Sequence, residues 1–363
     1  MEIQAEPLRR LVASIFRALR SPDEEAAYIG QRLVSANLYG HDSHGVVRVP
    51  RYAEWVRIGH LVPGQEPEVI IDNPTMALLD GRRGFGQSVG TRAVQIGIDK
   101  AKAGGLSLIG LRNVGHLGRI GDWGEMAAAA GLVAIHFVNV GGSQLVAPFG
   151  GVDRRMGTNP VVIAVPRPGE EPLLLDFATS LVAEGKVLVA ARGGKAVPNG
   201  SLIGPDGSLS ADPGLLYGAD NLKNGVFNPM LGPGALRTMG EHKGSGLSFM
   251  CEILAGALTG SPCAGPGNQL AVNGRLSIYM APEFFGSTHD FAAMTKEYIE
   301  FFKSSRPSTP GGEVLMPGEP ERRTRDARLA KGVPLSDEVW RAILATARDV
   351  GVPNSQLADV PPG

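Results

Sequence analysis

From about Met76 onward, short apolar runs alternate with alanine- and glycine-rich segments of helical spacing, and this alternation limits the chain to a mixed α/β body. The strand candidates are residues 76–79, 106–111, 132–138, 161–165, 173–175 and 276–280, and the helix candidates are 88–103, 121–130, 247–258 and 292–302. The amino-terminal part differs, because apolar side chains recur there every three or four positions. The sequence therefore predicts a helical amino-terminal unit followed by a larger α/β unit.

Local signals place the ends of several helices. Ser21 and Glu24 have the spacing of a capping box, and Pro22 suits a first helical position, so a second helix is expected to start there and to stop at Gly40. Pro50 predicts a third helix over residues 50–58. A last helix is expected over 336–350, and we expect it to pack back on the amino-terminal helices.

The chain has 363 residues, more than the ~250 to 300 at which a single core stops growing, so we expect two or three units. The expected units are a helical domain over 1–75, an α/β domain over 76–316, and a carboxy-terminal segment over 317–363. Residues 192–241 are rich in Gly, Pro, Asn and Asp, which predicts a loop far longer than the usual ~4 to 6 residues. Such a loop is typical of a lid, a binding surface or a partner contact.

Charge and cysteine content exclude several classes of protein. Lys and Arg total 35 against 36 for Asp and Glu, which gives no global field for nucleic acid or an anionic membrane. Cys251 and Cys263 lack zinc-ligand spacing, and His41 and His44 have no neighbouring ligand cluster, so we expect no metal. No apolar run of about 18 residues and no secretory leader are evident. We therefore expect a cytoplasmic protein that binds a small molecule.

The segment Ser43-His44-Gly45-x-x-Arg48 combines a proton carrier with a guanidinium four positions later. That spacing puts His44 and Arg48 on one face, and Pro50 places both on the connector entering a helix. A histidine exchanges protons near neutral pH, and an arginine fixes a carboxylate with two parallel hydrogen bonds. The pair predicts a 2-oxo or 2-hydroxy acid site; alternatively, His44 is a capping or buried histidine and Arg48 a solvated charge.

The usual nucleotide and hydrolase motifs are missing from the sequence. Gly84-Phe-Gly86-Gln-Ser-Val-Gly90 has one residue too many for the Gly-x-Gly-x-x-Gly fingerprint, so it predicts a turn that leads into a helix. The sequence also lacks a Walker loop, a GxSxG elbow and an HExxH helix. These absences argue against common phosphoryl-transfer, serine-hydrolase and zinc-protease chemistry.

Further polar groups occur in glycine-rich surroundings. His116 follows a predicted strand in the segment Asn113-Val-Gly-His116 and is a second candidate hydrogen-bond partner. Asp176 ends an apolar strand, where it fits either ribose hydroxyls or an ordinary helix N-cap. Lys243 precedes an apolar helix and is either a pyrophosphate partner or a solvated lysine.

With these segments in order, the chain resembles the malate/L-lactate dehydrogenase family that lies outside the Rossmann superfamily. The matching pieces are Ser43-His44-Gly45 with Arg48, Asn113 with His116, Gly157-Thr-Asn-Pro160, Asp176 to Thr179, His242-Lys243-Gly244 and Gly332-Val-Pro-Leu335. They extend from residue 8 to about residue 350. Each piece is weak alone, and their common order carries the resemblance.

The resemblance implies an NAD- or NADP-dependent oxidoreductase of small 2-hydroxy and 2-oxo acids that works as a homodimer. It also implies a non-Rossmann cofactor domain with a largely antiparallel mixed sheet, and a helical domain built from both termini. His44, with Ser43, takes the acid/base role, Arg48 clamps the substrate, and His116 and Thr158 supply further hydrogen bonds. The implied cofactor contacts are Leu174, Leu175, Asp176, Phe177, Ala178, His242, Lys243, Gly318, Glu319 and Pro320.

Several alternatives stay open. Asp176 favours the free ribose hydroxyl of NAD, slightly preferred here, while Arg167 would suit the 2′-phosphate of NADP. Similar imine reductases carry an aspartate where this chain has Gly185-Lys186, so Lys186 favours a hydroxy acid or keto-sugar acid over a cyclic imine. Enzymes similar to this one use malate, lactate, ureidoglycolate, sulfolactate or diketogulonate. A catalytically silent dinucleotide-binding sensor is the alternative outside enzymes.

Overall fold

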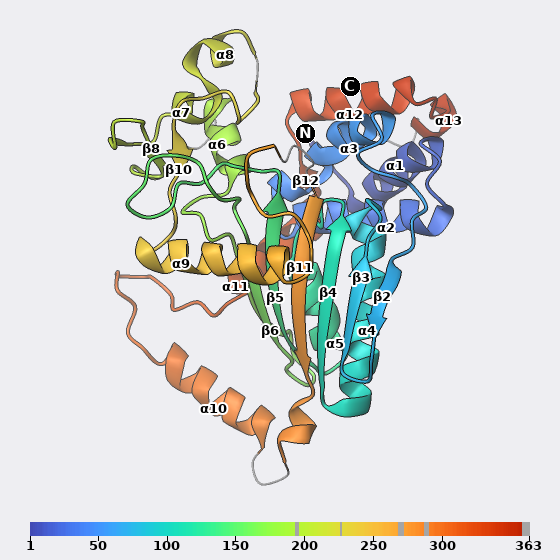
Figure 1. Ribbon diagram of the computed structural model, residues 1–363, viewed down its shortest axis with the longest axis vertical. Helices are drawn as coiled ribbons and strands as arrows, with labels where there is room; N and C mark the ends of the chain where they lie inside the picture. The colour runs from blue at the N-terminus through green and yellow to red at the C-terminus, as the bar shows by residue number, and fades with distance from the viewer. Residues whose placement is uncertain (193–195, 226, 268–271, 287–289, 358–363) are drawn as a thin grey trace.

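The centre of the molecule is a seven-stranded sheet with the order β2-β3-β4-β11-β5-β6-β7, seen in the computed structural model of Figure 1. The structure describes residues 1–192, 196–225, 227–267, 272–286 and 290–357. The strands are β2 Glu68–Asp72, β3 Met76–Asp80, β4 Leu106–Val114, β5 Val133–Gly141, β6 Val161–Val165, β7 Leu173–Phe177 and β11 Val272–Met280. Only β3 and β4 run parallel; the other neighbouring strands of this sheet are antiparallel.

Helices cover both faces of this sheet. On one face, α4 Gly86–Gly104 and α5 Gly121–Ala129 bury a core that includes Trp123 and Tyr279. On the other face, α9 His242–Cys251 continues into a π-helical segment, Glu252–Ala257, which contacts β4, β5 and β11. The helix predicted at 247–258 therefore begins earlier than expected, and its second half is a π-helix, a rare form that occurs often at functional sites.

A second core belongs to a helical layer assembled from both ends of the chain. Its helices are α1 Ala5–Ala18, α2 Asp23–Leu38, α3 Val49–Arg57 and α12 Asp337–Asp349, with α11 Glu319–Lys331 and α13 Asn354–Leu357 beside them. Trp340 of α12 is fully buried among amino-terminal residues such as Leu8 and Phe16. The strands β1 Glu2–Ile3 and β12 Val333–Pro334 also pair, so the two ends lie side by side (Figure 1). The predicted fold class, an α/β fold with a largely antiparallel sheet and this helical layer, is confirmed; the exact domain boundaries stay a prediction.

The segment predicted as a loop over 192–241 is instead a small folded unit, which we call the small lobe (the described residues from 184 to 238). It contains α6 Glu184–Ala191, β8 Leu202–Ile203, β9 Leu209–Ser210, α7 Gly214–Tyr217, α8 Ala219–Lys223 and β10 Ala235–Leu236. Val187, Leu202, Leu216, Tyr217 and Leu236 share a core there. Strands of two residues are too short to produce a recognisable alternation, and residues 193–195 and 226 lie outside the described part.

Two local features differ from the sequence-based prediction, and one agrees with it. The capping box is wrong, because α2 begins at Asp23 with Pro22 at its N-cap, and no side-chain hydrogen bond caps it. Strand β2 was missed, because all of its residues are exposed and it has no alternation. Gly40 does end α2, in a left-handed conformation with φ of 83°. Finally, no helix in the described ranges is long and apolar enough to cross a bilayer.

Candidate active site

His44 and Arg48 lie on two short 3-10 turns, Asp42–His44 and Val46–Arg48, that connect α2 to α3. The turns fold tightly around Asn37 of α2, whose Oδ1 accepts the Val46 N–H at 2.8 Å. A Cβ on Gly45 would lie 2.1 Å from that same oxygen, so only glycine fits between the turns. The connector predicted from the sequence is therefore held rigidly against the helical layer.

The structure places His116 beside His44. Their rings stack with centroids 5.5 Å apart and planes 14° from parallel. Ser43 Oγ lies 3.1 Å from His44 Nδ1, and Tyr52 OH lies 2.5 Å from His116 Nδ1. The amide of Gln87 donates to the Tyr52 hydroxyl at 3.3 Å. The Nδ1 atom of each imidazole is therefore oriented by a neighbouring hydroxyl, that of Ser43 or of Tyr52. No motif in the sequence points to Tyr52, whose spacing predicts only an apolar position of its helix.

Both imidazoles are neutral at neutral pH. Burial lowers the pKa of His44 well below its ordinary value, and the neighbouring His116 and Arg48 lower it further. Burial and Arg48 lower the pKa of His116 to about 3. Burial likewise raises the pKa of Tyr52 to about 12, so the phenol keeps its proton. Both imidazoles are therefore available as neutral bases near neutral pH, and once protonated they release the proton readily.

Arg48 is anchored through Nε and faces a carboxylate through one of its terminal nitrogens. Its Nε donates to the Ser43 carbonyl at 2.6 Å, while Nη2 lies 3.9 Å from Glu184 Oε2. Tyr217 of the small lobe donates its hydroxyl to Glu184 Oε1 at 2.6 Å. The sequence argument used Lys186 at this place, but Lys186 is exposed and the carboxylate of Glu184 faces Arg48 instead.

The backbone of Thr158 is hydrogen-bonded to Thr179, which follows strand β7. Its carbonyl accepts the N–H and the hydroxyl of Thr179 at 3.0 and 3.1 Å. The next residue, Asn159, is fully buried and donates to Glu252 Oε1 of the π-helical segment at 2.9 Å. Thr158 is thereby held in a fixed position, and its half-buried side chain has no hydrogen bond in the described part of the chain.

The predicted cofactor stretches 174–178 and 318–320 come together in space. The Leu174 N–H faces the Pro317 carbonyl at 3.4 Å, and a Cβ on Gly318 would lie 3.3 Å from the Leu174 carbonyl oxygen. Gly318 has φ of 87° and caps α11, so glycine permits this approach. Leu175 is exposed, Phe177 and Ala178 are half-buried, and Glu319 accepts the Met316 N–H at 2.6 Å while Pro320 stays exposed.

The donor set at this edge suits a dinucleotide. Asp176 Oδ2 accepts the Gly121 N–H at 2.8 Å, which leaves Oδ1 for hydroxyl donors. Burial raises the pKa of Asp176, while Arg119 and the Gly121 N–H lower it. His242 and Lys243 are exposed at the start of α9, and Lys243 forms no ion pair among the described residues. Asp176 supplies a carboxylate that suits ribose hydroxyls. Lys243 supplies a cation at a helix amino terminus, which suits a phosphate.

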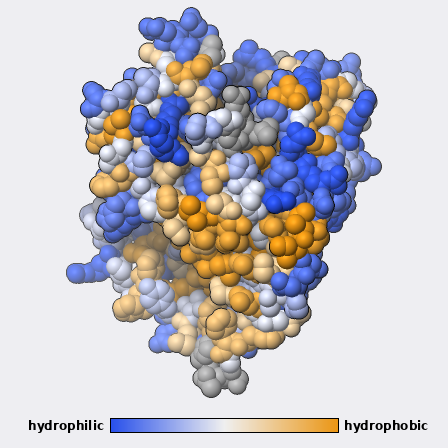
Figure 2. Space-filling view, viewed as in Figure 1, coloured by the Kyte–Doolittle hydropathy of each residue, from blue (hydrophilic) through white to orange (hydrophobic). Residues whose placement is uncertain are grey.

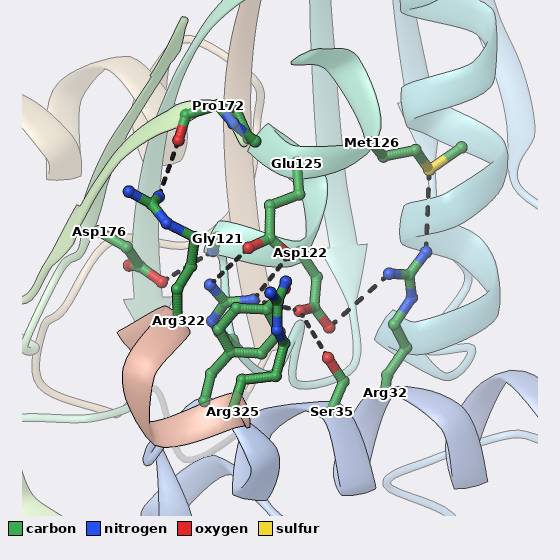
Figure 3. Close-up of polar contacts among 12 residues, drawn as sticks. Arg32, Ser35, Gly121, Asp122, Glu125, Met126, Pro172, Asp176, Arg322 and Arg325 are labelled. Atoms are coloured by element: carbon green, nitrogen blue, oxygen red, sulfur yellow. Dashed lines mark hydrogen bonds and ion pairs between the residues drawn. The ribbon is translucent and has the colours of Figure 1, made fainter. Parts of the chain in front are cut away.

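An ionic cluster behind Asp176 joins the helical layer to the sheet, and Figure 3 shows it. The Arg119 side chain is fully buried and contacts Asp122 at 2.8 Å and Glu125 at 2.9 Å. Its guanidinium lies 3.9 Å from the ring centroid of Tyr39, and Arg325 donates to the Tyr39 hydroxyl at 3.2 Å. Burial lowers the pKa of Arg119, but the two carboxylates raise it overall above its ordinary value.

Comparisons with known proteins show the family and the fold of this chain. A family model described as malate/L-lactate dehydrogenase matches residues 3–344. Hydroxycarboxylate dehydrogenase B of Escherichia coli K12 is 39% identical over 97% of this chain and 95% of its own length. The solved structure of a putative malate/lactate dehydrogenase from E. coli has a TM-score of 0.91 at 38% identity, covering 99% of this chain and 98% of that one. A Δ1-piperideine-2-carboxylate reductase from Pseudomonas syringae has a TM-score of 0.81 at 29% identity, covering 96% and 100%.

The contact between α6 and the catalytic turn provides a first prediction. A Cβ on Gly185 would lie 2.0 Å from Ser43 Cβ, so Gly185→Ala must push the two segments apart. We expect the free energy of unfolding to fall by about 1 to 3 kcal/mol, the usual cost of overpacking, measured by denaturant titration. Gly246→Ala is the control, because its Cβ would meet nothing within 4 Å. Equal stability of the two variants would contradict this contact.

Proposed function

The chain belongs to the malate/L-lactate dehydrogenase family, and from that premise we propose that it transfers a hydride between a nicotinamide cofactor and a small 2-hydroxy or 2-oxo acid, with His44 carrying the proton. The family and the enzyme class predicted from the sequence are thereby confirmed. The observation that carries our assignment of roles is the stacked, neutral His44 and His116 pair beside Arg48, whose terminal nitrogens form no hydrogen bond among the described residues.

His44 and Arg48 divide the work on the substrate. Arg48 is fixed through Nε, so its remaining N–H groups can hold the substrate carboxylate beside the imidazole. In the oxidising direction neutral His44 accepts the hydroxyl proton, and in the reducing direction protonated His44 returns it. General acid–base help of this kind is worth roughly a hundred- to ten-thousand-fold in rate. The bound nicotinamide supplies or takes up the hydride.

Ser43 and His116 assist His44. The Ser43 hydroxyl contacts His44 Nδ1 and so directs Nε2 toward the substrate. His116, oriented by Tyr52, offers its own Nε2 to the substrate oxygen, and Thr158 adds a hydrogen bond from the neighbouring loop. Neutral imidazoles are suitable here because a charged His116 would oppose protonation of His44.

We assign the cofactor to the edge formed by residues 174–178, 242–243 and 318–320. Asp176 accepts the ribose hydroxyls through Oδ1, and Lys243 at the start of α9 faces the pyrophosphate. NAD is preferred over NADP because Arg167, the candidate for a 2′-phosphate, is already paired with Glu170. Parallel assays with NADH and NADPH test this, and a higher kcat/KM with NADPH would reverse the preference.

A cyclic imine reductase is the second candidate, and Glu184 is the observation that favours it. A carboxylate beside the site would stabilise a protonated imine nitrogen, and a structural relative is named as such a reductase. A panel of 2-oxo acids and cyclic imines, followed by loss of reduced-nicotinamide absorbance, decides between them. Turnover of imines alone would replace the hydroxy acid assignment, and cofactor binding without any turnover would favour the silent sensor.

Replacement of His44 tests its role directly. We expect His44→Gln to lower kcat by a hundred- to ten-thousand-fold while nicotinamide binding, followed by fluorescence, stays within about twofold. His60→Gln is the control, since His60 follows the end of α3 and belongs to neither histidine segment of the site. Equal losses of turnover and cofactor binding would show that His44 is a structural residue.

The lowered pKa of His44 predicts the pH dependence of alcohol oxidation. The base must be neutral in the free enzyme, so kcat/KM should rise with pH through a midpoint below the ordinary histidine pKa of 6.5. Arg48→Gln removes one cause of the lowering, so its midpoint should move upward, whereas exposed Arg51→Gln should leave it unchanged. A wild-type midpoint at or above 6.5 would be inconsistent with this site.

We also propose that the protein is a homodimer. Large apolar side chains stay exposed on the 3-10 turn Pro282–Phe285 and on α10 Phe291–Lys303, including Phe285 at 64%, Tyr298 at 65% and Phe301 at 74%. Helix α10 projects from the body in Figure 1, and Figure 2 shows apolar surface on the same face. An exposed apolar surface of this kind indicates a protein interface.

Sedimentation analysis tests the dimer. The wild-type protein should sediment as a dimer, and Phe301→Glu should shift it toward the monomer because a charge would be buried at the interface. Leu329→Glu, an equally drastic change at an exposed position of α11, is the control and should leave the dimer intact. A monomeric wild-type protein would end this proposal.

A further inference from the structure

Glu184 occupies an unusual place beside the predicted substrate clamp. It is the first residue of α6 and only 17% of its side chain is exposed. One carboxylate oxygen lies 3.9 Å from Arg48 Nη2, and the other accepts the Tyr217 hydroxyl at 2.6 Å. The small lobe therefore places a negative charge directly against the group that is to receive the substrate carboxylate.

Tyr217 fixes this carboxylate in position. The tyrosine is fully buried in the core of the small lobe. Burial raises the pKa of its phenol, and the adjacent Glu184 raises it further, so the hydroxyl remains a donor. The close approach of Gly185 to Ser43 holds the start of α6 against the catalytic turn. Glu184 therefore cannot swing far from Arg48 without disturbing both contacts.

The charges around the site then sum to zero. His44 and His116 are neutral, and Arg48 is balanced by Glu184. The next cations do not change this balance. Arg119 is balanced by Asp122 and Glu125, Arg192 is paired with Glu338 at 3.3 Å, and Lys186 is exposed to solvent. A substrate with one carboxylate restores a single negative charge, whereas a dicarboxylate adds a second one to a half-buried space.

We propose that Glu184 makes this enzyme selective for 2-oxo and 2-hydroxy monocarboxylic acids whose tail carries a hydroxyl group, against dicarboxylates. This inference rests on the proposed function. Like charges held a few ångströms apart in a partly buried site repel strongly. A tail hydroxyl instead donates to a carboxylate, which is among the stronger hydrogen bonds in proteins. A site built to accept a hydroxyl proton discriminates well against analogues that cannot donate.

A matched pair of substrates tests the selectivity. Oxaloacetate and 4-hydroxy-2-oxobutanoate are similar in length and differ in whether the tail ends in a carboxylate or a hydroxyl. With the full-length protein and NADH or NADPH, we expect kcat/KM for the hydroxylated acid to exceed that for oxaloacetate by at least tenfold. Glu184→Gln, which removes the charge and keeps the shape, should lower this ratio at least tenfold.

Two further variants separate charge from structure. Glu184→Asp keeps the charge and should keep the preference for the hydroxylated acid. Tyr217→Phe removes the donor to Glu184 but leaves the carboxylate, so the preference should keep its direction. A ratio unchanged in Glu184→Gln, or an equal loss with both substrates, would overturn the inference and leave Glu184 a structural residue.

The outcomes also distinguish this inference from the function on which it rests. A wild-type preference for oxaloacetate would overturn the selectivity alone, since turnover of a 2-oxo acid would still support the proposed reaction. Absence of turnover with both substrates and with a wider panel of 2-oxo acids, despite nicotinamide binding measured by fluorescence, would overturn the proposed function and this inference with it.

Discussion

The arrangement of the site depends on the contacts of the buried Arg119 guanidinium with Tyr39, Asp122 and Glu125. Arg119 lies three residues after His116, stacks on Tyr39 at the end of α2, and is balanced by Asp122 and Glu125. Only Gly40 and His41 separate Tyr39 from the turn that carries His44, so one cation fixes both histidine segments and the edge where Asp176 lies. Breaking a buried ion pair typically costs about 3 to 5 kcal/mol, which makes this junction expensive to rearrange.

The side chains around the proposed substrate site carry no net charge. Burial keeps His44 and His116 neutral, and Glu184 compensates Arg48. In such a site the carboxylate of the arriving substrate becomes the largest uncompensated charge, so it can favour protonation of His44 at the moment the proton is needed for reduction. The small lobe takes part because its Tyr217 holds Glu184 in position.

The sequence predicted the parts of the fold that have local signals. The strands from β3 to β7 and β11 are apolar runs of sufficient length, and the helices α4, α5 and α10 have clear spacing. The sequence does not reveal strand β2 because its side chains are exposed, and it predicts a loop over 192–241 because the strands of the small lobe are two residues long. The antiparallel order of the sheet came from the family resemblance, since periodicity does not report which strands pair.

By itself, the sequence determined the family and the reaction class, because its short motifs follow one order along the chain, and it predicted the His44–Arg48 pair from their spacing of four residues. The tertiary structure alone decided what surrounds that pair. Tyr52 reaches His116 across 64 positions, and Tyr217 reaches Glu184 across 33. No local pattern encodes such contacts, because they exist only after the helical layer, the sheet and the small lobe have packed together and excluded water from the space between them.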